Sequence, residues 1–108
     1  MAAGSHLSSE TIFRIVRQSY GAMNLCYERG LRFAPTLHGR IAVKFTIEQN
    51  GTVSLAADRD SDLPDPDIVA CVVRGFLNLS FPSSSSGRVT VVYPIEFRPD
   101  AEGGVGVP

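Results

Sequence analysis

The two cysteines, Cys26 and Cys71, are the residues of this sequence whose chemistry could most affect its structure. A zinc site would need four ligands in local pairs, whereas the two histidines, His6 and His38, are scattered. The cysteines are not in a Cys-x-x-Cys arrangement, so the spacing does not indicate redox catalysis. Composition alone leaves two interpretations open, namely two unrelated buried thiols or one disulfide bond.

A short acidic segment, Asp58-Arg59-Asp60-Ser61-Asp62, has the spacing that begins a calcium-binding loop. Leu63 stands at the sixth position, where such a loop needs glycine, and the twelfth position carries no acid. We therefore favour a solvent-exposed loop over a calcium site. The sequence predicts no metal and no cofactor.

Nothing in the sequence arranges a nucleophile for catalysis. The chain contains no Gly-x-Ser-x-Gly motif, and His38 has no nearby cysteine or histidine. The serines at 83–86 are typical of a flexible connector, and Gly87-Arg88 lacks the pattern of a phosphate-binding loop. We expect a protein that is not an enzyme.

Composition restricts the class of protein further. The 108 residues are 44% hydrophobic and 19% charged, which fits one folded domain. A net charge of −1 offers no basic field for nucleic acid, and no apolar run approaches the ~20 residues that cross a bilayer. We expect residues 1–8 to be a vector-derived or flexible start, because Met1–His6 lacks the features of a signal peptide.

Apolar residues recur at helical spacing from Ser9 to Arg29, which predicts a single helix with its tyrosines and methionine in the core, namely Tyr20, Met23 and Tyr27. A second helix is expected after Asp65, which can cap it, with Pro66 at the first helical position.

Alternating residues predict three strands. The first covers 40–48, and Asn50-Gly51 favours a two-residue hairpin turn into a strand whose inward residues would be Val53, Leu55 and Ala57. The last strand has five alternating apolar positions: Val89, Val91, Tyr93, Ile95 and Phe97. We expect the folded domain to cover 9–99 and the glycine-rich tail, 100–108, to be flexible.

The expected order is helix, strand, strand, helix, strand. Three strands with one apolar face require cover from both helices. The predicted fold class is therefore α+β, a two-layer sandwich with a three-stranded antiparallel sheet and two helices on one face, the opposite face remaining in water.

The sequence resembles the AgmX/PglI C-terminal domain, one of the TonB-like C-terminal domains. The resemblance covers about Ser9 to Pro99 and is carried by Cys26-Tyr27-Glu28, Leu31, Pro35, Leu37-x-Gly39, Gly51, Ser61, Leu63, Asp65, Val69, Cys71, Phe81-Pro82 and Val92-Tyr93-Pro94-x-x-Phe97. It implies the same order of elements and a disulfide between Cys26 and Cys71.

The resemblance also implies a location. Domains of this family are periplasmic, at the C-terminus of proteins anchored in the inner membrane, and are linked to gliding motility and adhesion. This chain departs from TonB itself, because no Tyr-Pro motif leads into the first helix and TonB domains generally lack these cysteines. Coupling to a proton-driven motor is therefore not carried over.

The last strand is a candidate docking edge. Its five alternating residues, 89–97, would lie at an open edge where an envelope protein, in the outer membrane or the periplasm, could add a strand, as the TonB-like resemblance implies. Pro94 fits an edge strand, but it could equally blunt that edge against aggregation. Two alternatives remain: peptidoglycan binding through Arg40 and Lys44 on the open face of the sheet, and a purely structural spacer.

Overall fold

The N-terminal helical segment is two helices, so the single helix predicted over 9–29 is wrong. In the computed structural model, which describes residues 7–99 and 105–106, α1 (Ser9–Gln18) and α2 (Tyr20–Leu31) are separated at Ser19. The Ser19 amide bonds to the Val16 carbonyl at 2.9 Å and its hydroxyl lies 3.5 Å from the Ile15 carbonyl. This side chain competes with the regular helical hydrogen bond, and the chain turns there.

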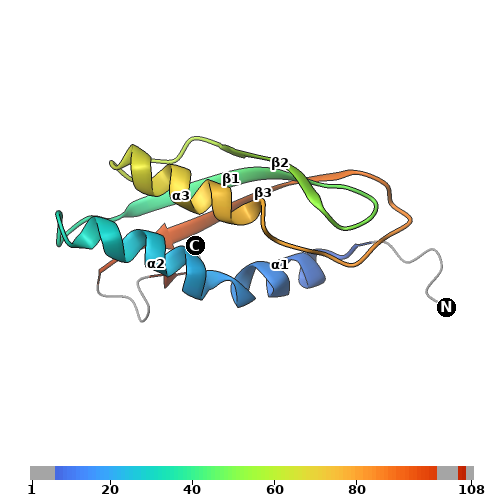
Figure 1. Cartoon of the computed structure of the whole chain (residues 1–108), viewed down its shortest axis with the longest axis horizontal. Coiled ribbons are helices and arrows are strands. Elements are labelled where there is room, and N and C mark those ends of the chain that lie inside the picture. The colour runs from blue at the N-terminus through green and yellow to red at the C-terminus, as the bar shows by residue number, and fades with distance from the viewer. Residues whose placement is uncertain (1–6, 100–104, 107–108) are drawn as a thin grey trace.

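The rest of the described chain forms one four-stranded antiparallel sheet and a third helix. The strands are β1 (Gly39–Ile47), β2 (Val53–Asp58), β3 (Val89–Phe97) and β4 (Val105–Gly106), all antiparallel in the order β2-β1-β3-β4. The third helix, α3 (Pro66–Phe76), is capped by Asp65 as predicted. Figure 1 shows the helices packed along the sheet as a second layer.

The predicted α+β two-layer sandwich is therefore confirmed. The two-residue β4 was not expected, since it falls inside the predicted flexible tail. The other tail residues, 100–104 and 107–108, lie outside the described residues, as does the predicted start of the chain up to residue 6.

The hairpin after β1 differs from the predicted two-residue turn. The Glu48 amide bonds to the Thr52 carbonyl and the Gly51 amide bonds to the Glu48 carbonyl, both at 2.8 Å. The loop therefore has three residues, 49–51, and its last residue, Gly51, has φ +94°. This is the arrangement in which a glycine at positive φ closes a three-residue hairpin.

The register of β2 changes directly after this turn. Val53 lies opposite Ile47 and is buried, but Leu55 lies opposite Thr46, so Ser54 is an extra residue in β2. Because side chains alternate along a strand, this bulge turns Leu55 and Ala57 to the open face. The prediction that both point inward is wrong, and Leu55 is 59% exposed.

The core lies between the helices and one face of the sheet. Tyr27 and Met23 are buried as predicted, and Tyr20 is half-buried against them. The fully buried side chains come from all of the longer elements except β2: Val16, Met23, Tyr27, Ile41, Val43, Phe45, Ile47, Val72, Phe76, Ile95 and Phe97. Removal of this apolar surface from water is the main stabilising contribution.

Candidate functional site

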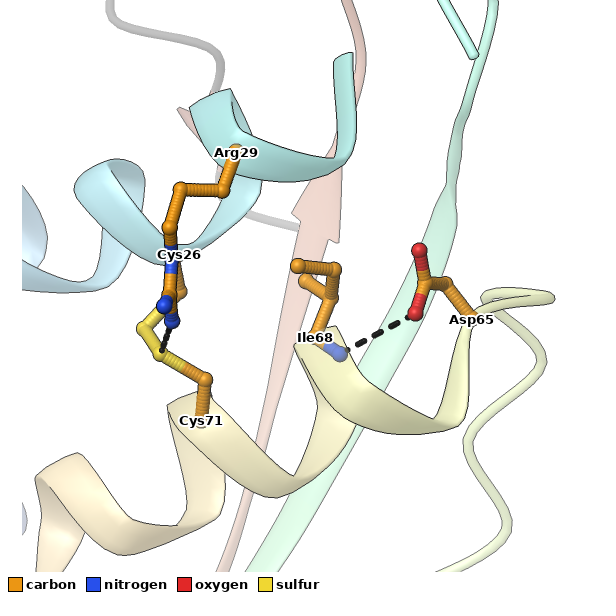
Figure 2. The surroundings of a disulfide bond; sticks show 5 residues. All are labelled: Cys26, Arg29, Asp65, Ile68 and Cys71. Carbon is orange, nitrogen blue, oxygen red and sulfur yellow. Dashed lines mark hydrogen bonds between the residues drawn. A yellow bond between two sulfur atoms is a disulfide. The ribbon is translucent and has the colours of Figure 1, made fainter. Parts of the chain in front are cut away.

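A disulfide bond joins the two longer helices. Cys26 of α2 and Cys71 of α3 are bonded, with their Cα atoms 5.9 Å apart (Figure 2). The guanidinium of Arg29 donates to Cys71 Sγ at 2.8 Å. The structure therefore contains the pairing that the resemblance implied.

The outer side of β1 is identified by its hydrogen bonds to the segment after β2. The Arg40 carbonyl accepts from the Asp62 amide at 2.9 Å, and the Ala42 carbonyl accepts from the Arg59 amide at 2.8 Å. Both main-chain groups of a strand residue point to the same neighbouring strand. The even-numbered residues of β1 therefore face β2, and the odd-numbered residues face β3.

The same alternation shows which main-chain groups of β3 are directed away from β1. Odd-numbered β1 residues pair with Val89, Val91, Tyr93, Ile95 and Phe97, so these five predicted edge residues use their main-chain groups in the β1–β3 ladder. Tyr93, Ile95 and Phe97 are at least 90% buried in the core, and the other two predicted residues are half-buried. The outward groups belong instead to the even-numbered residues between them.

Thr90, Val92 and Pro94 provide those outward groups. Thr90 and Val92 were not among the predicted edge residues, although Pro94 holds the signal that identifies them. Because proline has no N–H, it is tolerated in a sheet where its nitrogen faces away from the neighbouring strand. Residues 90 and 92 are even-numbered like Pro94, so their main-chain groups also point away from β1.

Part of this edge is occupied by the chain itself. β4 pairs with Glu96 and Phe97, at the end of β3. Between Val89 and Ile95, no strand pairs with the outer side of β3 within the described residues. The outward edge there offers two N–H donors and three carbonyl acceptors, because Pro94 lacks a donor.

The surfaces on both sides of this edge are partly apolar. On the helical side, Phe13 of α1 packs edge-on against Tyr93, with ring centroids 5.4 Å apart, and stays 41% exposed. On the open face Val92 is 45% exposed, next to Thr90, whose hydroxyl bonds to that of Thr46. A strand added here would find apolar contacts above and below its backbone.

The opposite edge of the sheet is less regular. The bulge at Ser54 interrupts β2, and Asp58 and Asp62 are used within the adjoining loop: Asp58 accepts from Ser61 and Asp62 accepts from the Arg40 amide. Within the described part of the chain, no three acidic, histidine or cysteine side chains are placed to hold a metal ion. The acidic carboxylates thus have a structural role in closing this loop.

The two predicted cell-wall contacts lie apart on the open face. Arg40 donates to the Asp60 carbonyl at 2.9 Å and lines a cleft of about 660 Å³ with His38 and Glu96. Lys44 is exposed between Ala57 and Val92 and does not line that cleft. Arg40 and Lys44 are four positions apart on β1, which places their Cα atoms ~13 Å from each other.

The open face of the sheet is less exposed to solvent than predicted. Ala42 and Thr46 are buried, since both lie on the central strand between neighbours. Near the hairpin, Glu48 forms an ion pair with Arg88 at 3.1 Å. A hydrogen bond from Ser54, and secondarily the Arg88 contact, lower the pKa of Glu48.

No helix in residues 7–99 is both long and apolar enough to cross a membrane. No protein-family model matches the chain, and no curated protein matches it. Among solved structures, it is similar to the solution structure of the TonB C-terminal domain of Helicobacter pylori, with 18% identity and a TM-score of 0.59. The match covers 89% of this chain and 87% of that chain. The likeness shows that the chain has the fold of a TonB C-terminal domain.

Proposed function

We propose that this domain is a non-catalytic protein-interaction module of the bacterial cell envelope, which binds an extended partner segment at the outer edge of β3. The observation that carries the proposal is the outward direction of the main-chain groups of Thr90 and Val92, on a nine-residue strand that is otherwise regular. A partner strand adds to such an edge by main-chain hydrogen bonds, while side-chain contacts set its preference.

Two observations of different kinds support the proposed location. The fold is that of a TonB C-terminal domain, and the Cys26–Cys71 bond is of the kind that persists in an oxidising compartment. Both support a periplasmic location, and we propose that the domain forms the C-terminus of a protein anchored in the inner membrane. The partner would be an outer-membrane or periplasmic protein of a gliding-motility, adhesion or TonB-like complex.

The proposal extends to the character of the partner segment. It would be extended and would carry apolar side chains toward Phe13 on one side and Val92 on the other. A carbonyl of the partner segment placed opposite Pro94 would find no N–H donor, so the segment should end or turn there. Pairing over Thr90 and Val92 would then supply most of its main-chain bonds.

The proposal is tested by an NMR titration with short peptides copied from periplasm-facing segments of envelope proteins. Amide shifts should fall within Arg88–Arg98, largest at Thr90 and Val92. Shifts confined to the helices would contradict strand addition.

Two variants test the hydrogen-bonding pattern directly. Val92→Pro removes an outward donor and should weaken binding by about three- to tenfold, without breaking the ladder to β1. Pro94→Val adds a donor at the matched position and should strengthen binding. Equal affinities for both variants and the unchanged chain would contradict the proposal.

A second candidate function is binding to peptidoglycan. The observation that favours it is the cleft lined by Arg40, His38 and Glu96, which combines a cationic and an anionic side chain. The chain should then co-sediment with purified peptidoglycan, and Arg40→Glu with Lys44→Glu should abolish this. Absence of both peptide binding and co-sedimentation would favour a structural spacer instead.

A further inference from the structure

The disulfide lies at the boundary between the core and the surface of the helical layer, because Cys26 belongs to the core and Cys71 packs against it. Both cysteines line an open pocket of about 360 Å³, together with Arg29, Arg32 and Glu28. Cys26 is 8% exposed, whereas Cys71 is half-buried and therefore the more accessible of the two. An external reagent would approach the bond from the side of Cys71.

The charge next to Cys71 favours an anionic sulfur. The Arg29 guanidinium lies 2.8 Å from Cys71 Sγ. Figure 2 shows it directed at this sulfur. A disulfide sulfur is a weak, neutral acceptor, but a thiolate is an anion, so the same contact is stronger once the bond is opened. The acid in the pocket, Glu28, accepts a hydrogen bond from Asn24 at 2.8 Å.

We propose that the Cys26–Cys71 bond is a thiol–disulfide exchange site for an external dithiol, with Cys71 as the attacked sulfur and Arg29 as its positioning residue. The thiolate of the reagent attacks Cys71 Sγ and forms a mixed disulfide, and Cys26 leaves as a thiolate that takes a proton from water. The second thiol of the reagent loses its proton and attacks the mixed disulfide, which releases Cys71 as a thiolate beside Arg29. Two electrons pass from the dithiol, which becomes a disulfide, to the protein, which gains two thiols.

Arg29 would act in both steps, by attracting the incoming thiolate and by stabilising the Cys71 thiolate that leaves. The exchange would remove the covalent link between α2 and α3. It does not depend on strand addition at β3, because the sulfur pair lies between the helices.

The rate of reduction of the full chain by dithiothreitol tests the proposal, with alkylation and mass spectrometry as the readout. Arg29→Gln should be reduced about three- to fivefold more slowly, and higher salt should narrow this difference. Arg29→Lys should recover part of the rate. The matched control is Arg14→Gln, which removes the same charge from exposed α1 and should leave the rate unchanged.

Two further measurements distinguish direct attack on the disulfide of the folded chain from reduction of an unfolded chain. The rate should rise linearly with dithiothreitol concentration, and the monothiol glutathione should leave its adduct on Cys71. A rate independent of reagent concentration, an adduct on Cys26, or an Arg29→Gln rate equal to that of the unchanged chain would each overturn the proposal.

Discussion

The hydroxyl oxygens of Tyr20 and Tyr93 lie 2.8 Å apart and share a hydrogen bond between the start of α2 and the middle of β3. The helix break at Ser19 directly precedes Tyr20, so the bond holds the first residue of α2 against β3. Tyr93 is itself 5% exposed and packs against Phe13 and Phe76. The candidate edge strand is thereby tied to the helical layer.

Tyr20→Phe should lower the free energy of unfolding by about 1 kcal/mol, because the buried Tyr93 hydroxyl loses this partner. Urea unfolding of the single variant would measure the loss. The double variant with Tyr93→Phe should cost less than the sum of the two single losses, since both remove the same bond. Strictly additive losses would show that the two hydroxyls do not stabilise each other.

The same pair predicts a dependence of stability on alkaline pH. Burial raises the pKa of Tyr20 well above its ordinary value, and the hydrogen bond to Tyr93 raises it further. The folded chain therefore holds this proton more tightly than the unfolded chain does. This contribution to stability is fully present below pH ~10 and is lost as the pH rises toward the folded pKa.

Urea midpoints measured at increasing alkaline pH should accordingly fall more steeply for the unchanged chain than for Tyr20→Phe. Parallel curves for the two proteins would contradict the predicted shift.

Gly51→Ala should destabilise the hairpin strongly. A Cβ at this position would lie 1.8 Å from the Phe81 carbonyl oxygen, and φ is +94°. Gly87 is the matched control, because it has φ +76° with open space around it, and Gly87→Ala should cost about 1 kcal/mol. We expect the Gly51 variant to exceed that loss by at least ~2 kcal/mol in urea unfolding. Similar losses for the two variants would argue against the close contact with Phe81.

Replacing both cysteines by alanine should lower the free energy of unfolding by about 4 kcal/mol, because the bond closes a sequence separation of 45 residues. Denaturant unfolding of the oxidised chain and the Cys26→Ala/Cys71→Ala variant would measure the difference. The reduced chain should unfold close to the double variant. A loss below ~1 kcal/mol would show that the helices hold their positions without the bond.

Much of the fold could be predicted because its signals are local. Asp65 and Pro66 mark the start of α3 within two residues, and the alternation in β1 and β3 identifies the core face of each strand directly. Such signals depend on neighbours in the chain, so a sequence shows them without the rest of the molecule. The α+β class and the placement of both cysteines on helices followed from these elements.

Other features depended on contacts between distant residues. The break at Ser19 coincides with the bond between Tyr20 and Tyr93, and the three-residue hairpin places Gly51 against Phe81. The outward position of Val92 depends on how β3 pairs with β1. The local conformational preferences of these residues are similar for the predicted and the observed arrangement. The packing and hydrogen bonds of the assembled sheet and helices therefore decide between them. Sequence alone therefore determined α3, β1 and β3, whereas the tertiary structure determined the break between α1 and α2, the register of β2 and the direction of the candidate binding edge.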